Sequence, residues 1–209
     1  MRDIPQLFRP LVLRGIQTRN RVVISPMCQY SAHEGHMDDW HLVHLGRFAI
    51  GGAGIVFTEA TAVQKAGRIT HGCPGLWCDS QIPSHAKVAQ FALRNGAIPA
   101  IQLGHAGRKG GMQRPWHGNG PLNTADFERG DMPWTPVGPS EIPVAEGWPV
   151  PHALTTSEIK NLIKDYVAAA QRALAAGYKI AEIHGAHGYL VHSFLSPLSN
   201  KRDDDYGGN

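Results

Sequence analysis

The sequence contains little cysteine and no long apolar run. Its three cysteines, Cys28, Cys73 and Cys78, are too few for a disulfide framework, and the last two have no second pair to complete a zinc site. No apolar run approaches the roughly 18 residues that span a bilayer. Residues 1–15 have neither the continuous apolar core nor the small-residue cleavage site of a signal peptide. We therefore expect a cytoplasmic protein that does not associate with a membrane.

Charge of either sign is also sparse. The formal net charge is +3, charged residues make up 18% of the chain, and lysine and arginine form no run. A nucleic-acid partner is therefore not expected, because such binding depends on clustered positive charge. Hydrophobic residues make up 42%, which is typical of a globular domain.

Strand-like and helix-like segments alternate along the chain. Thr155 with Glu158 forms a capping-box pattern at the start of the clearest helix, and Gly177 follows its end. The alternation predicts a parallel sheet, either doubly wound or a (β/α)₈ barrel. No G-x-G-x-x-G motif follows the first strand, which counts against a dinucleotide-binding doubly wound sheet. The predicted strands are residues 21–25, 54–60, 97–103 and 179–185, and the predicted helices are residues 39–52, 80–95 and 156–176.

Residues 104–153 interrupt this alternation. The segment is rich in glycine and proline, and no pattern in it predicts a long helix or strand. Loops of this length are commonly functional. Trp116, Trp134 and Trp148 favour packing against the domain, so we expect a packed lid over residues 104–153.

Polar side chains follow each predicted strand. Active sites of parallel α/β proteins form at the carboxyl ends of the strands, so these side chains are expected to share one rim. They are Ser25, Cys28, Gln29 and Tyr30 after the first strand, Thr61 after the second, Gln102, His105 and Arg108 after the third, and His184, His187, Tyr189 and His192 after the fourth.

The pair His184 and His187 permits three interpretations. Two imidazoles three residues apart can ligate a metal ion, although a stable site needs a third ligand and we expect Glu182 to point away from the pair. Two imidazole N–H groups can instead stabilise negative charge that develops on one carbonyl oxygen. Tyr189, whose phenol is protonated at neutral pH, would then be a nearby proton donor. Ordinary turn chemistry is the third interpretation.

Cys28 is similarly ambiguous from the pattern alone. A lone cysteine after a strand is most often a packing residue. At a catalytic rim it serves as a nucleophile or adjusts the properties of a cofactor. The sequence pattern leaves these interpretations open.

Several motifs together resemble the old yellow enzyme family, and more narrowly its bacterial NADPH dehydrogenase and xenobiotic reductase class. The resemblance implies an FMN-binding (β/α)₈ barrel that acts as an NADPH dehydrogenase and ene-reductase. NADPH or NADH would reduce FMN, and hydride would then pass to the β-carbon of a small activated alkene, such as an α,β-unsaturated carbonyl compound, in a ping-pong cycle. The matching stretches, which span essentially the whole chain, are SPMCQYSA, DWHLVHLGRFAIGGAGIVFTEATAV, GRITHGCPGLW, QLGHAGRKG and EIHGAHGYLVHSFLSPLSNKRDDDYGG.

The resemblance also implies roles for individual residues. Cys28 stands where the eukaryotic branch has threonine and would adjust the flavin potential. The histidine pair would hold the substrate carbonyl, and Tyr189 would donate a proton to the α-carbon, so the resemblance favours carbonyl activation over a metal site. The implied flavin contacts are Pro26, Met27, Cys28, Ala60 and Gln102, and the implied substrate contacts are Tyr30, His184, His187 and Tyr189.

The chain is short for this architecture, because (β/α)₈ barrels typically have about 250 residues. We therefore expect residues 1–209 to be the N-terminal part of one FMN-binding barrel domain, with about four βα units and the lid-like insertion at about 104–153. The family's arginine on the next strand and its phosphate-binding region are not in this sequence. We expect open sheet edges that favour association, weak FMN binding by the 209-residue chain alone, and a homo-oligomer for the full-length form.

Two other functions stay open. In the first, the chain is a non-catalytic half-barrel that associates with a partner. In the second, it is a metal-dependent TIM-barrel hydrolase that uses His184 and His187.

Overall fold

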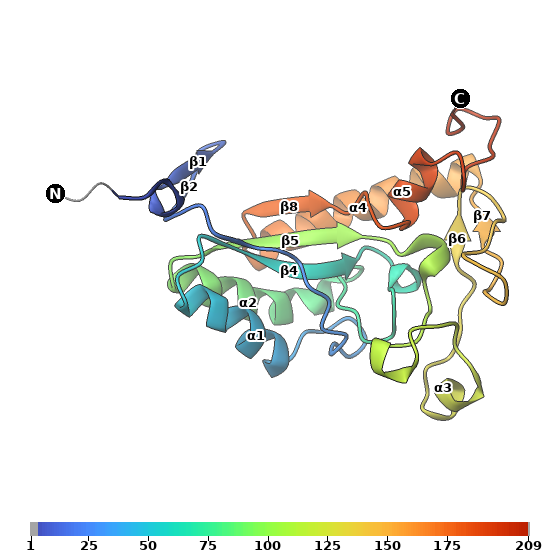
Figure 1. Ribbon diagram of the computed structural model, residues 1–209, viewed down its shortest axis with the longest axis horizontal. Coiled ribbons are helices and arrows are strands. Elements are labelled where there is room, and N and C mark those ends of the chain that lie inside the picture. The colour runs from blue at the N-terminus through green and yellow to red at the C-terminus, as the bar shows by residue number, and fades with distance from the viewer. Residues whose placement is uncertain (1–3, 209) are drawn as a thin grey trace.

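A computed structural model describes residues 4–208, so residues 1–3 and 209 of the expected domain lie outside it. Its main element is a 4-stranded parallel sheet in the order β3-β4-β5-β8 (Figure 1). Sheet order follows chain order, so each strand lies beside the one before it, as in a (β/α)₈ barrel. The strands are β3 Val23–Ile24, β4 Ile55–Ala62, β5 Ile98–Gly104 and β8 Ile180–Ile183.

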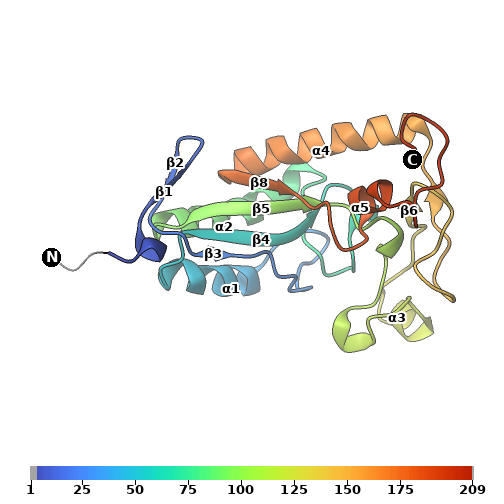
Figure 2. The same cartoon turned by 45° about the horizontal axis from the view of Figure 1, so that its top comes forward.

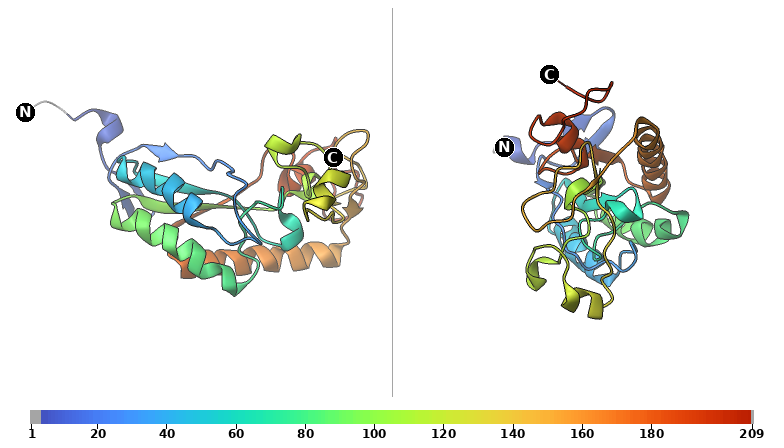
Figure 3. Two further views of the ribbon diagram at one scale, coloured as in Figure 1. Left: turned by 90° about the horizontal axis from the view of Figure 1, so that it is seen from below. Right: turned by 90° about the vertical axis from the view of Figure 1, so that its right-hand side faces the viewer.

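Three long helices pack side by side along one face of this sheet (Figures 2 and 3). The sequence predicted all three. In the last one the Thr155 side chain accepts from the Glu158 N–H, and Gly177 ends the helix with φ of 100°. The second begins later than predicted, because residues Asp79–Gln81 form a 3₁₀ turn before it. The helices are α1 Asp39–Ile50, α2 Ile82–Arg94 and α4 Thr156–Ala176.

The two outer strands of the sheet are shorter than predicted, with 2 residues in β3 and 4 in β8. Each has a hydrogen-bonded neighbour on one side only, so less pairing extends it. A hairpin of β1 Leu11–Leu13 and β2 Ile16–Thr18 precedes the sheet and was not predicted. Its turn uses positive φ at Arg14 and Gly15, as two-residue hairpin turns require.

Residues 104–153 lie at the carboxyl ends of the strands (Figure 1). The Trp134 indole N–H donates to the Ala66 carbonyl at 2.8 Å, and its ring lies 5.2 Å from the Arg68 guanidinium carbon. Arg202, outside the segment, donates to the Pro139 carbonyl at 3.0 Å. The segment is therefore packed onto the domain by polar contacts. Its elements are two 3₁₀ turns, Gly107–Lys109 and Pro115–His117, the helix α3 Thr124–Glu128, and the strands β6 Val137–Gly138 and β7 His152–Ala153. The helix α5 Leu190–Leu195 follows β8 further along the chain.

No helix among residues 4–208 combines the length and the apolar character that crossing a membrane requires. The expected cytoplasmic location stays a prediction.

A buried polar network ties the sheet to its helices. The Tyr178 hydroxyl lies 2.9 Å from Thr58 Oγ1 and 3.1 Å from His85 Nδ1, and His85 Nε2 lies 3.1 Å from the Gly75 carbonyl. Thr58, His85 and Tyr178 are each at most 4% exposed. The Tyr178 hydroxyl therefore satisfies two buried groups that have no access to water.

We expect Tyr178→Phe to lower the free energy of unfolding by about 1–3 kcal/mol, because Thr58 and His85 would keep their burial but lose a hydrogen-bond partner. Urea denaturation measures the effect. Tyr206→Phe is the matched control, since the Tyr206 hydroxyl makes no hydrogen bond within residues 4–208. Equal stability of the Tyr178→Phe and Tyr206→Phe variants would contradict the role of this network.

Candidate active site

The carboxyl ends of four strands meet at one pocket of about 480 Å³. The spatial expectation from the sequence, that these ends share a rim, is therefore met. Met27 does not line the pocket, because its side chain points outward and is 41% exposed. The lining residues are Ser25, Pro26, Cys28, Tyr30, Ala60, Gln102, Glu182, His184, His187 and Tyr189.

A β-bulge in β4 places Ala60 in this pocket. The register of β4 and β5 shifts between the pairs Thr58–Ile101 and Ala60–Gln102, so Glu59 has no partner on β5. In a regular strand Thr58 and Ala60 would share a face. With the bulge, Thr58 bonds Tyr178 in the core while Ala60 lines the pocket.

Gln102 and Glu182 supply the polar side of the pocket. Gln102 Nε2 donates to Glu182 Oε1 at 2.6 Å, and Gln102 is 8% exposed. The side-chain amide oxygen of Gln102 has no hydrogen-bond partner within residues 4–208. The expectation that Glu182 points away from His184 was wrong. Residues two apart on a strand lie on the same face, and Glu182 and His184 both line the pocket.

The two imidazoles face each other across the pocket wall. His184 Nε2 and His187 Nδ1 are 3.4 Å apart. His184 Nδ1 accepts from the Ala186 N–H at 3.3 Å, which leaves the proton of the neutral ring on Nε2. Burial lowers the pKa of His184, with a smaller lowering by His187, so His184 is neutral at pH 7. In the structure the His184 Nε2–H points at His187 Nδ1, and with the Nδ1–H tautomer of His187 both nitrogens would donate to a single oxygen atom that bridges them.

Three further groups in the pocket hold protons at neutral pH. Burial raises the pKa of Tyr189, and the nearby Cys28 and Cys73 raise it further. Burial also raises the pKa values of Tyr30 and Cys28, and a hydrogen bond links their side chains. Tyr189 is therefore a phenol that can donate a proton, and Cys28 is a thiol rather than a nucleophilic thiolate.

Two of the five non-glycine residues with positive φ in residues 4–208 line this pocket. Tyr30 and His187 have positive φ of 53° and 57°, an uncommon conformation for residues with side chains. Lys109 Nζ donates to the His187 carbonyl at 2.6 Å and lies 5.7 Å from the centre of the Tyr189 ring. Lys109 thus holds the turn that presents His187 and Tyr189 to the pocket.

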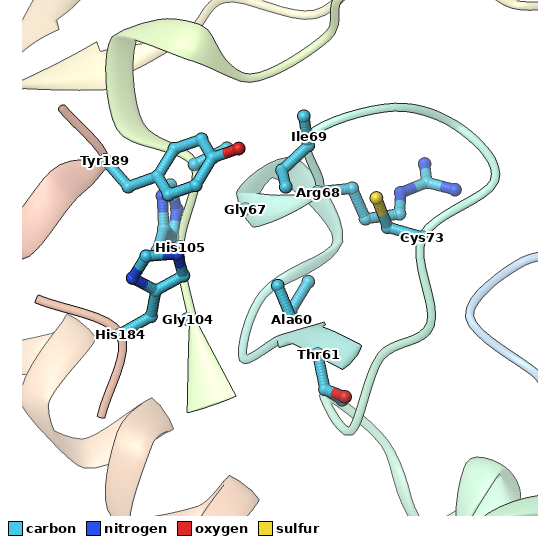
Figure 4. A pocket seen from close by; sticks show the side chains of 12 residues that line it. Ala60, Thr61, Gly67, Arg68, Ile69, Cys73, Gly104, His105, His184 and Tyr189 are labelled. Atoms are coloured by element: carbon cyan, nitrogen blue, oxygen red, sulfur yellow. The ribbon is translucent and has the colours of Figure 1, made fainter. Parts of the chain in front are cut away.

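A cavity of about 10 Å³ lies behind the pocket and shares Ala60, His184 and Tyr189 with it (Figure 4). His105 also lines this cavity, but its ring nitrogens bond Gln64 at 3.1 Å and the Gly107 N–H at 3.0 Å. Of the other rim candidates, Arg108 bonds residues of the 104–153 segment, and His192 Nδ1 accepts from the Gly188 N–H at 2.6 Å. These three residues support the surrounding backbone.

Within residues 4–208, no three histidine, cysteine, aspartate or glutamate side chains are grouped so that they could hold a metal ion. The ligand set that a hydrolase with His184 and His187 would need is thus not assembled in this part of the chain.

A parallel sheet whose strand order follows the chain, with a pocket at the carboxyl ends of its strands, is the arrangement found in α/β-barrel enzymes. The chain belongs to the NADH:flavin oxidoreductase / NADH oxidase family, whose family model matches residues 6–209. This confirms the flavin oxidoreductase class that the motifs predicted.

Individual relatives agree with this assignment. The NADH:flavin oxidoreductase FG08077 of Gibberella zeae is 46% identical over 97% of the chain and 49% of the relative. An NADPH dehydrogenase of Bacillus licheniformis is 42% identical over 97% of the chain and 55% of the relative. The crystal structure of Old Yellow Enzyme from a Pichia species matches 98% of the chain and 52% of its own, with 27% identity and a TM-score of 0.81. The chain therefore spans about half the length of the curated relatives it matches.

Proposed function

We propose that the chain carries the substrate side of an FMN-dependent NADPH dehydrogenase that reduces activated C=C bonds of α,β-unsaturated carbonyl compounds. The observation that carries this proposal is the meeting of Cys28, Gln102, His184 and Tyr189 around one pocket. The family assignment and the relatives' names support the flavin and the nicotinamide nucleotide as cofactors.

The residues present fit a flavin ring. The pocket of about 480 Å³ falls within the usual range for ligand sites, and Pro26, Cys28 and Ala60 give it an apolar wall for a flat aromatic ring. The unpaired side-chain amide oxygen of Gln102 would accept a hydrogen bond from a ring N–H at the polar edge of the flavin. When bound, FMN supplies the hydride chemistry that no side chain can perform. Met27 would contribute through its backbone, because its side chain points outward.

The side chains of the turn after β8 would act on the substrate. His184 and His187 would donate to the carbonyl oxygen, which stabilises the negative charge that develops there when the β-carbon accepts hydride. Tyr189 would deliver its proton to the α-carbon, because its raised pKa keeps the phenol protonated. Tyr30, whose ring meets Trp116 edge-on at 6.2 Å, would shape the substrate pocket and link it to the lid at residues 104–153.

An apolar groove of about 760 Å³ lies between α4 and α5, beside the free edge of β8. Ile163, Val167 and Ile183 line it and are more than half exposed. The Tyr166 hydroxyl is buried there without a partner in residues 4–208. Since the relatives are about twice as long, we propose that this groove receives a further strand and helix like those in the relatives' second half. The non-catalytic half-barrel that associates with a partner remains the second candidate, and its partner would use the same groove.

Joining this chain to the second half of the Bacillus licheniformis relative tests the function. We expect the joined protein to retain yellow FMN through gel filtration and to oxidise NADPH when 2-cyclohexenone is added. The 209-residue chain alone should lose FMN. Adding the second half as a separate polypeptide tests the alternative of a non-catalytic half-barrel, which predicts association without NADPH oxidation. Alkene reduction that returns on mixing would support the enzyme.

The double variant His184→Ala/His187→Ala in the joined protein is the control for site assignment. It should still bind FMN and still be reduced by NADPH, but bind a phenol such as 4-hydroxybenzaldehyde at least about 10-fold more weakly, because both donors to the oxygen are gone. Retained FMN without any NADPH oxidation in the parent protein would overturn the proposed activity.

The homo-oligomeric state of the full-length form stays a prediction.

A further inference from the structure

Behind the pocket, a buried carboxylate holds the loop that carries Cys28. Glu59 is 3% exposed, and its Oε2 accepts from the Gln29 N–H at 2.8 Å. Its Oε1 lies 3.5 Å from Nε2 of His41 in α1, which is 1% exposed. Burying a charged carboxylate is costly unless other groups compensate it. Here the Gln29 N–H and the nearby His41 imidazole compensate the carboxylate of Glu59.

The β-bulge explains how Glu59 reaches this loop. Glu59 is the residue of β4 that has no partner on β5. Its side chain therefore does not follow the regular alternation of side chains between the two faces of the sheet. The same bulge directs Ala60 into the pocket. One irregularity of the strand thus supplies both a wall of the pocket and the anchor behind it.

The anchored N–H lies between two pocket residues. Cys28 and Tyr30 flank Gln29 and both line the pocket, and Tyr30 has positive φ of 53°. The Gln29 side chain adds two contacts, from its Nε2 to the Met27 carbonyl at 2.8 Å and from the Trp40 indole N–H to its Oε1 at 3.1 Å. Both of these hydrogen bonds are exposed to solvent, whereas the bond from the Gln29 N–H to Glu59 is shielded from water.

We propose that Glu59 is a positioning residue, which through the Gln29 N–H fixes the loop that presents Cys28 and Tyr30 to the flavin pocket. The inference rests on the proposed function for the identity of the ligand, but the anchoring itself does not require FMN. The charge of Glu59 also acts on Cys28: burial, Cys73 and Glu59 together raise the pKa of that thiol.

Alkylation of the 209-residue chain by iodoacetamide at pH 8, followed by peptide mass spectrometry, tests the anchor. Cys28 reports on the loop, buried Cys73 on global opening, and half-exposed Cys78 on intrinsic reactivity. We expect Glu59→Gln to speed alkylation of Cys28 at least about 10-fold relative to Cys78 while Cys73 stays protected, because the loop loosens and the thiolate is no longer opposed by a neighbouring charge. His41→Gln should give a smaller effect of the same kind.

A matched control is His44→Gln, one turn further along α1, which should leave all three rates unchanged. Cys28 rates within about 2-fold of wild type in Glu59→Gln would overturn the proposal, and so would equal acceleration of Cys28 and Cys73, which would show general destabilisation. Repeating the reaction with excess FMN on the protein joined to a second barrel half separates the two ideas, because the 209-residue chain alone is expected to lose FMN. Protection of Cys28 by FMN in the joined protein supports the flavin pocket. Selective exposure of Cys28 in Glu59→Gln without any FMN protection of the joined protein would leave the anchor standing and remove the flavin site.

Discussion

Replacing Tyr189 with phenylalanine in the protein joined to a second barrel half is expected to slow reoxidation of the reduced flavin by 2-cyclohexenone about 100-fold or more. Reduction of the flavin by NADPH should change much less. The reason is that only the oxidative half-reaction consumes a proton at the α-carbon, and loss of a general acid typically costs a factor of about 10²–10⁴. The Tyr189 ring lies 4.9 Å from the His184 ring, beside the nitrogens that would hold the carbonyl.

Stopped-flow absorbance at the flavin band measures the two half-reactions separately. His33→Gln is the control, because His33 is exposed and lies outside both the pocket and the groove. The control should match the parent protein in both half-reactions. If Tyr189→Phe slowed both half-reactions equally, Tyr189 would be shaping the pocket rather than donating a proton. An unchanged rate of reoxidation would show that solvent or another group supplies the proton.

The sequence predicted the parts of the fold that follow from local patterns. The helix over 156–176 is an example: its capping box and left-handed glycine are contained in the sequence itself, and the structure has the same bounds. Strand ends were harder to place. β8 stops at Ile183 because it lies at an edge of the sheet, a property of the tertiary arrangement rather than of the residues 179–185.

The candidate site divides in the same way. His184, His187 and Tyr189 were found because they cluster in sequence after a strand. Glu182 was misplaced by an error in applying strand alternation, and the two-residue spacing to His184 was the signal that could have corrected it. Glu59 was missed altogether. Its position depends on a bulge in β4, and a bulge is set by pairing with a neighbouring strand that the sequence does not reveal.

Two buried histidines predict a steep loss of stability in mild acid. His85 and His105 are 0% and 3% exposed, and burial lowers their pKa values to about 3 and about 4. Each neutral ring already uses both nitrogens. His85 contacts the Tyr178 hydroxyl and the Gly75 carbonyl, and His105 contacts the Gly107 N–H and Gln64. A proton added to His105 would therefore remove the hydrogen bond accepted from the Gly107 N–H, and a proton added to His85 would bury a charge and force the Tyr178 hydroxyl to accept instead of donate.

The sign of the effect follows from linkage. The unfolded chain binds protons at these histidines near pH 6.5, whereas the folded chain does so only near pH 3 to 4. Stability is complete above pH 6.5 and is lost as the pH falls from that value toward the folded pKa values. Between pH 8 and pH 5 each histidine should lower the free energy of unfolding by about 2 kcal/mol. His41 acts in the opposite direction: burial lowers its pKa, but Glu59 and Asp38 raise it overall.

Urea denaturation at pH 8, 7, 6 and 5 measures this loss. In His105→Gln, whose amide keeps an acceptor and a donor, we expect the decrease to shrink by about 2 kcal/mol, since one buried titration is gone. The exposed residue His33 provides the control, and His33→Gln should follow the wild-type profile. A stability that stays constant from pH 7 to pH 5, or a slope unaltered by His105→Gln, would show that these rings gain protons as readily in the folded chain as in the unfolded one. The buried contacts of His85 and His105 would then be weaker than their geometry indicates.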